Sequence, residues 1–104
     1  MADLTAYLNS DNVITLNGLI DAVDSSYQNT ATVQVTLTDY NGNEVTGETW
    51  PLTMNYVSAS NGDYRATLVD TLNVSEGSYT ATITADAGVN QLRTFIVTVN
   101  YVES

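Results

Sequence analysis

Apolar and polar residues alternate along much of the chain, and threonine occupies many of the polar positions. A period of two is typical of β-strands that turn one face to a core and the other to solvent. Residues 31–38, 64–69, 79–85 and 94–101 follow this pattern. We therefore expect each of these segments to form a half-buried strand.

Two further stretches are expected to be less regular strands. Residues 13–20 are largely apolar, but Gly18 interrupts them, which indicates a bulge or a change of sheet. Residues 50–57 contain Pro51, which cannot donate to a ladder and belongs at the first residue of a strand or on an edge. Since no segment has a helical period over a useful length, the pattern predicts an all-β fold.

Turn residues separate these runs at regular distances. Asn-Gly, the strongest short hairpin signal, occurs at Asn41-Gly42 and Asn61-Gly62 and predicts two tight hairpins. About seven short strands result, which is typical of an antiparallel β-sandwich. A chain of 104 residues has room for one such domain. We place the sandwich in residues 13–104 and expect residues 1–12 to form an N-terminal arm or a first strand.

The phase of the alternation predicts which side chains face the core. The expected inward-facing residues are Val33, Val35, Leu37, Tyr64, Ala66, Leu68, Tyr79, Ala81, Ile83, Val97 and Val99. Tyr79 also follows the turn Glu76-Gly77, and this position suits a tyrosine corner, in which the hydroxyl bonds to backbone a few residues upstream.

Two repeated phrases carry a family resemblance. Residues 62–68 (GDYRATL) and 77–83 (GSYTATI) both read Gly-x-Tyr-x-Ala-x-aliphatic. With the Ala-Thr-Val-x-Val-x-Leu strand at 31–37 and the Asn-Gly-Asn-x-Val-x-Gly turn at 41–47, they resemble bacterial and bacteriophage immunoglobulin-like domains over about residues 30–100. More narrowly, the phrases at 18–23 (GLIDAV), 31–33 (ATV), 50–52 (WPL) and 62–68 (GDYRATL) are similar to those of small proteins encoded beside head and tail-joining genes of tailed phages and prophages. The resemblance implies an immunoglobulin-like sandwich and a structural role in a virion.

The charge of the chain restricts its partners. The chain has twelve Asp and Glu residues and only two basic residues, Arg65 and Arg93, so the formal net charge is −10. Two arginines cannot neutralise the phosphates of a nucleic acid, and the acidic field favours a basic protein surface. Like-charged copies repel, so we expect a monomer in isolation. Both arginines are expected on outward-facing positions, where they bridge to carboxylates or hold the register of a partner.

The remaining sequence signals concern location. The amino-terminal residues Met1–Leu4 lack the basic region and apolar stretch of a signal peptide, and the sequence has no run of eighteen apolar residues. We therefore expect synthesis in a host cytoplasm, no membrane insertion and a final place in the virion. The expected partners are then other virion proteins: capsid, portal or tail.

Few residues suit metal or cofactor chemistry. Without cysteine or histidine, transition-metal sites are not expected. Residues 39–44 place oxygen ligands at alternate positions, as the start of a calcium loop does, but the twelfth position is Trp50 and the glycine falls one position early. We interpret this segment as a turn and expect no metal and no cofactor. A weak calcium site shared between acidic loops is left open, with candidates Asp21, Asp24, Asp63 and Asp86.

The aromatic residues outside the predicted core are candidates for partner contact. Tyr7, Tyr27 and Tyr40 lie in turns or in the leading segment, where an exposed ring can serve as a contact. Trp50 fits either an interface anchor or the core.

Three functions remain. The first is a non-enzymatic virion structural protein, a capsid decoration or head–tail joining subunit that acts by protein–protein binding. The second is a binding module for cell-surface glycans or a receptor, which exposed aromatics clustered at one end would favour. The third, an acidic hydrolase, needs two carboxylates facing one cleft. Without histidine or lysine the common catalytic sets are absent, so we do not expect an enzyme.

Overall fold

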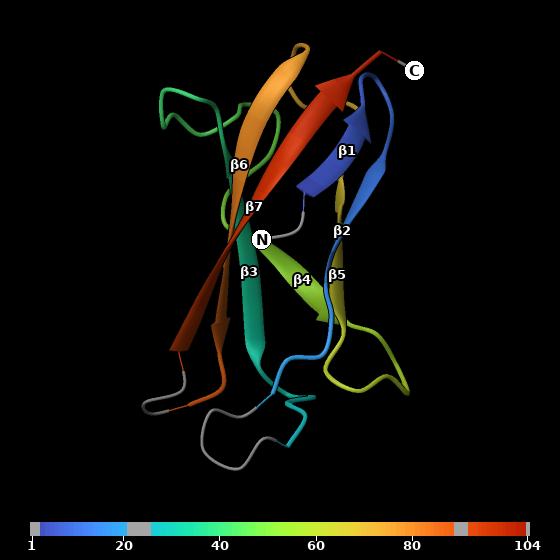
Figure 1. The fold of residues 1–104 in the computed structure, drawn as a ribbon, viewed down its shortest axis with the longest axis vertical. Helices are drawn as coiled ribbons and strands as arrows, with labels where there is room; N and C mark the ends of the chain where they lie inside the picture. The colour runs from blue at the N-terminus through green and yellow to red at the C-terminus, as the bar shows by residue number, and fades with distance from the viewer. Residues whose placement is uncertain (1–2, 21–25, 89–91, 104) are drawn as a thin grey trace.

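The fold is built from strands alone. The computed structural model describes residues 3–20, 26–88 and 92–103. Seven strands run through them: β1 (Asp3–Tyr7), β2 (Asn12–Leu16), β3 (Thr32–Thr38), β4 (Leu52–Tyr56), β5 (Tyr64–Leu68), β6 (Gly77–Asp86) and β7 (Leu92–Val102) (Figure 1). The predicted all-β class and the expected number of strands are confirmed.

All seven strands are hydrogen-bonded in the order β1-β7-β6-β3-β4-β5-β2. Every neighbouring pair is antiparallel except β1 and β7, which run parallel, with Asp3 opposite Thr98 and Tyr7 opposite Val102. The sheet is therefore mixed, and the expectation of a wholly antiparallel fold is wrong for this pair. Alternation along a strand reports which face is buried, but it says nothing about the direction of the neighbouring strand.

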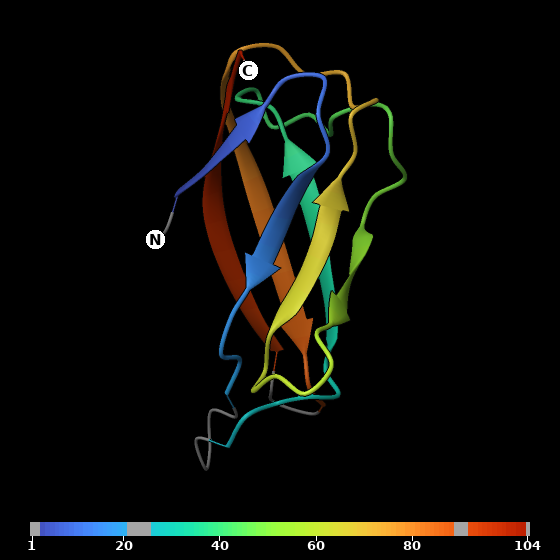
Figure 2. The same cartoon turned by 90° about the vertical axis from the view of Figure 1, so that its right-hand side faces the viewer.

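Strand β4 makes the sheet continuous. Its first part pairs with β3, with Met54 opposite Val33, whereas Tyr56 pairs with Tyr64 of β5. Because β4 changes partner along its length, the sheet curls into a nearly closed, barrel-like shape. Figure 2 shows β2 and β5 in front, with β3, β6 and β7 behind them.

The core fills the space inside this curl. All of the residues predicted to face inward are buried, except Tyr79 and Val97, which are partly buried and pack against the others. Ala85 and Tyr101, which continue the apolar phase of their segments, are buried as well. The core also contains buried residues outside the four alternating segments: Ala6, Ile14, Leu19, Val45, Met54 and Leu72.

Tyr64 connects the core to the long segment between β2 and β3. Its side chain is only 1% exposed. The hydroxyl donates to the carbonyl oxygen of Gln28 at 2.8 Å and accepts the N–H of Ala31 at 3.0 Å. These two bonds fix the path by which the chain enters β3.

The two Asn-Gly turns lie between strands, but the connections are longer than tight hairpins. β3 ends at Thr38 and β4 begins only at Leu52, and residues 57–63 separate β4 from β5. At Asn41-Gly42 the chain nevertheless folds back in a short hairpin, with Thr38 bridged antiparallel to Glu44 and the Val45 N–H donating to the Leu37 carbonyl at 3.0 Å. The prediction of a tight hairpin is confirmed there and is wrong at Asn61-Gly62. At the second turn the glycine has a different role, because Gly62 lies against the backbone of Leu19, whose N–H donates to the Gly62 carbonyl at 2.9 Å.

We expect Gly62→Ala to destabilise the fold much more than Gly18→Ala. Both glycines have positive φ, +74° and +68°, so both substitutions carry a similar backbone cost of about 1–2 kcal/mol. A Cβ at Gly62 would lie 2.5 Å from the Leu19 carbonyl oxygen, whereas one at Gly18 meets nothing within 4 Å. The collision should add about 1–3 kcal/mol in urea unfolding. Equal losses for the two variants would contradict this packing.

Candidate docking surface at the acidic end

The strand directions bring three connections to one end of the molecule, the upper end in Figure 1. We call this surface, made of residues 8–11, 39–51, 69–76 and 103, the acidic end. The backbone N–H of Asp70 donates to Oδ1 of Asp11 at 2.8 Å, and the N–H of Asn73 donates to the carbonyl of Thr46 at 2.9 Å. These bonds join the three connections to each other.

Carboxylates concentrate on this end. Those that lie there are Asp11, Asp39, Glu44, Glu48, Asp70, Glu76 and Glu103. Both arginines lie elsewhere, Arg65 near the start of β5 and Arg93 near the start of β7. A surface with this imbalance attracts cations and basic protein surfaces and accelerates their encounter.

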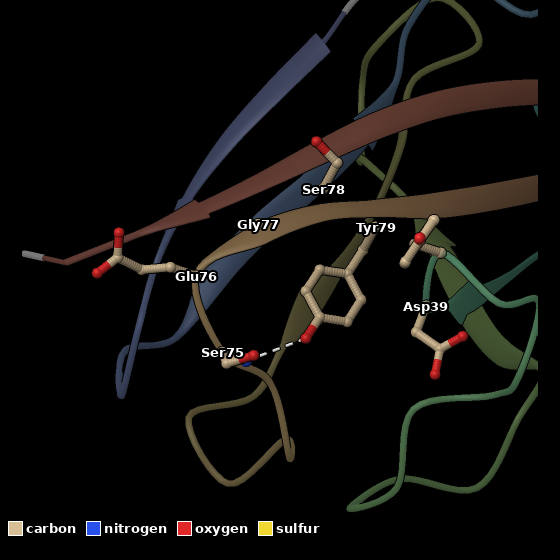
Figure 3. Close-up of a pocket in the computed structure, with 7 residues that line it drawn as sticks. Asp39, Ser75, Glu76, Gly77, Ser78 and Tyr79 are labelled. Carbon is tan, nitrogen blue, oxygen red and sulfur yellow. Dashed lines mark hydrogen bonds between the residues drawn. The ribbon is translucent and has the colours of Figure 1, made fainter.

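A hollow of about 270 Å³ opens beside Tyr79, between the β3–β4 connection and the start of β6 (Figure 3). Asp39 and Glu76 both line it, and Figure 3 shows them on opposite sides of the Tyr79 ring. A second hollow of about 180 Å³ shares Asp39 and Tyr79 and reaches Glu44. The acidic end is thus a shallow surface with two depressions around one tyrosine.

One hydrogen bond and one ring contact hold the Tyr79 side chain in place. Its hydroxyl accepts the N–H of Ser75 at 3.0 Å, four residues upstream (Figure 3). Its ring meets that of Tyr101 edge to face, with 5.4 Å between centroids. The upstream bond has the geometry predicted for a tyrosine corner, and it fixes the connection that carries Glu76.

The carboxylates at this end do not converge on a common point. Oδ1 of Asp39 accepts the N–H groups of Asn41 at 2.8 Å and Asn43 at 3.0 Å, as expected for a turn. Within the described ranges, no group of three or more acidic side chains is placed to hold a metal ion. Of the four calcium candidates, Asp63 and Asp86 lie near the opposite end, and Asp21 and Asp24 fall outside the described residues.

Three of the four predicted contact residues lie at or beside the acidic end. Tyr40 is 88% exposed and Tyr7, the last residue of β1, is 48% exposed. Trp50 is partly buried, and its Nε1–H donates to the carbonyl of Val45 at 2.6 Å. Tyr27, at 52% exposure, lies at the opposite end, where it bridges to Ile20.

The exposed rings do not form one platform. In the sheet order, β7 and β6 lie between β1, which carries Tyr7, and β3, which Tyr40 follows. Each ring was predicted separately from its place in a turn or in the leading segment, but the gathering of carboxylates at the acidic end was not predicted. The signal was available, because acidic residues lie mostly in the turns between threonine-rich strands, but the end to which each turn belongs depends on strand direction.

The structure corrects the account of the arginines. Arg93 is not on the outward-facing side of β7: it pairs with buried Ala85, and its guanidinium carbon lies 5.1 Å from the centroid of the Phe95 ring. Arg65 does face outward between Thr15 and Asn55. Neither arginine forms an ion pair with any residue that the structure describes, so the expected bridges to carboxylates are not found there.

The chain was compared with protein-family models and with curated proteins. No protein-family model matches the chain, and a search of curated proteins finds no match. In the described part of the chain, no helix has the length and apolar character needed to cross a bilayer.

We expect Tyr79→Phe to lower the free energy of unfolding by about 1 kcal/mol, because the Ser75 N–H loses its acceptor. The matched control is Tyr40→Phe, which removes a hydroxyl from a side chain that is 88% exposed and should leave stability unchanged. Urea unfolding of both variants measures the difference. An unchanged midpoint for Tyr79→Phe would show that the corner does not stabilise the fold.

The free energy of unfolding should fall at alkaline pH because of the buried hydroxyl of Tyr101. Burial raises the pKa of Tyr101 from 10.0 to about 12, and the nearby Tyr79 phenol adds to this effect. The unfolded chain therefore releases this proton near pH 10.0, whereas the folded chain keeps it until about pH 12. The contribution of Tyr101 to the free energy of unfolding is therefore fully present below pH 10.0 and is lost as the pH rises toward about 12.

The variant Tyr101→Phe isolates this contribution. The Tyr101 hydroxyl is buried and has no hydrogen-bond partner among the described residues, so the variant should be nearly as stable as the parent at neutral pH. Between pH 10 and 12, its free energy of unfolding should fall less steeply than that of the parent. Identical slopes in urea unfolding across this window would refute the assignment.

Proposed function

We propose that the chain is an immunoglobulin-like domain. Support comes from the two blocks of neighbouring strands, β7-β6-β3 and β4-β5-β2, which match the two sheets of a seven-strand immunoglobulin sandwich. The tyrosine at the start of the sixth strand, bonded to Ser75, is a second feature of that fold. Two departures are the parallel pairing of β1 with β7 and the shared pairing of β4.

We further propose that the protein is a non-enzymatic structural subunit of a phage or prophage virion, a capsid decoration or head–tail joining protein. The observation that carries this proposal is the acidic end, where carboxylates from three connections gather at one end of the molecule and exposed Tyr40 lines a hollow with Asp39 and Glu76. Such a surface fits a basic patch on a capsid, portal or tail protein. Location in the virion follows from this proposal.

Binding accounts for the acidic end better than catalysis does. The chain has no histidine and no cysteine, and the Asp39 and Glu76 carboxylates lie apart, on opposite sides of Tyr79 (Figure 3). A carboxylate pair for hydrolysis must face one substrate at a fixed separation. The glycan or receptor module remains the alternative, but the cluster of exposed rings at one end that would favour it is interrupted by β6 and β7.

The test is binding to purified capsid, portal and tail proteins of the encoding phage or prophage. We expect one of them to bind, with an association rate that falls as salt rises, because screening weakens attraction between exposed charges. The double variant Glu44→Gln, Glu76→Gln should bind more slowly and more weakly. Both side chains are exposed and have no bond with another described residue, so their loss should not disturb the fold.

A matched control separates the acidic end from net charge. Thr32→Lys with Thr94→Lys changes the net charge by the same two units on exposed positions far from this end. That variant should keep most of the binding. Equal loss in the two variants would refute the acidic end as the docking surface, and binding only to glycans or bacterial envelope proteins would favour the alternative. Deletion of residues 1–12 is not a suitable test, because it removes β1 from the sheet.

A further inference from the structure

The outer surface of β2, β5 and β4 contains a hollow at the point where β4 leaves β5. β4 pairs with β5 only through Asn55 and Tyr56, and its earlier residues pair with β3. On β5, residues 66–68 therefore have β2 as a partner on one side and no ladder with β4 on the other. A hollow of about 470 Å³ lies here, lined by Val13, Asn55, Tyr56, Arg65, Ala66 and Thr67.

Arg65 is the chemically distinctive residue of this hollow. It is one of only two cationic side chains, against twelve acidic ones, and it is exposed without an ion pair to any described residue. No carboxylate lines the hollow. The carboxylate nearest along the chain, Asp63, accepts the N–H of Gly18 at 2.9 Å. The guanidinium fork is thus free to bind an oxyanion.

The groups around Arg65 are neutral and polar. Thr15 on β2 and Asn55 on β4 lie directly opposite Arg65 in the two registers, so their side chains lie within contact distance of its own. Thr67 and exposed Val13 form the next pair along the strands. Hydroxyl and amide groups can donate to and accept from sugar hydroxyls, and an apolar side chain can pack against the carbon face of a sugar ring.

We infer that this hollow binds a carboxylated monosaccharide, such as the uronic acid or sialic acid unit of a surface polysaccharide. The guanidinium binds the carboxylate through two parallel N–H···O bonds, and Asn55 and Thr67, which line the hollow, bind the ring hydroxyls. The hollow has a volume of about 470 Å³ and six lining residues on three neighbouring strands, which fits a sugar unit better than an extended acidic peptide. The site lies on the outer surface of the sheet, and no residue of the connections that form the acidic end lines it, so binding there does not use the surface proposed for virion attachment.

The test is a titration of the isotope-labelled protein followed by NMR. D-galacturonate should shift the amide signals of Asn55, Arg65 and Thr67 saturably. D-galactose lacks the carboxylate and acetate lacks the ring. Each should therefore bind at least about 10-fold more weakly than D-galacturonate, as expected for loss of one set of charge-assisted or polar bonds. Equal affinity for galactose, or for acetate, would overturn the inference.

Variants of the two arginines provide the matched comparison. Arg65→Gln should abolish the galacturonate shifts, and Arg65→Lys should keep a weaker response, because a point charge replaces the planar fork. Arg93→Gln should bind as the parent does. Should Arg65→Gln lose its dispersed spectrum, Thr67→Val tests the same site and should weaken binding several-fold. Saturable binding by a glutamate peptide but not by either sugar acid would also overturn the inference.

The two proposals fail separately. The variant Glu44→Gln, Glu76→Gln changes only the acidic end, so it should bind galacturonate as the parent does. Loss of sugar binding in that variant would show that the hollow is not an independent site.

Discussion

The buried hydroxyl of Tyr64 is the constraint on which one end of the fold depends. The ring occupies the centre of the core, and its hydroxyl bonds to Gln28 and Ala31 in a segment that has no ladder of its own. A second bond, from the N–H of Gly62 to Oδ1 of Asn29 at 2.8 Å, joins the same segment to the β4–β5 connection. Since a buried hydroxyl without partners costs about 1–3 kcal/mol, the core and this connection stabilise one another.

Strand β4 determines the shape of the rest. If it paired with only one neighbour along its whole length, the molecule would have two separate sheets. Because it changes from β3 to β5 within five residues, the sheet remains continuous and still encloses a core. The same change leaves residues 66–68 of β5 without a ladder on the side toward β4, where the hollow beside Arg65 lies. The proposed sugar site is thus a consequence of how the sheet curls.

The alternation along each segment was enough to predict the strands and the core. The pairing of strands that are far apart in the sequence could not be predicted in this way. Val33, Ala81 and Val99 alternate with threonine, so their burial follows from period alone. The parallel pairing of β1 with β7 joins the two ends of the chain, and nothing in either segment encodes it. Arg93 was assigned to the wrong side of β7, and Gly18 was included in a strand that ends at Leu16. The acidic end was missed for the same reason, since its members come from separate turns.

The distribution of charge follows from the same alternation. Strands with apolar residues inside and threonine outside leave few positions for acidic residues except the connections, so the outer face of β3, β6 and β7 carries uncharged rows such as Thr38, Thr80 and Thr98. A net charge of −10 is then concentrated near the ends of the molecule. Exposed charges farther apart than a Debye length, about 8–10 Å at ordinary salt, are largely screened from each other. Arg65 lies near the start of β5, five residues along the chain from Asp70 of the acidic end, so screening reduces the effect of those carboxylates on it. An acidic protein can for this reason present a surface for cations at its end and one for a carboxylate on its side, and salt should weaken binding at each, since both attractions are between opposite charges.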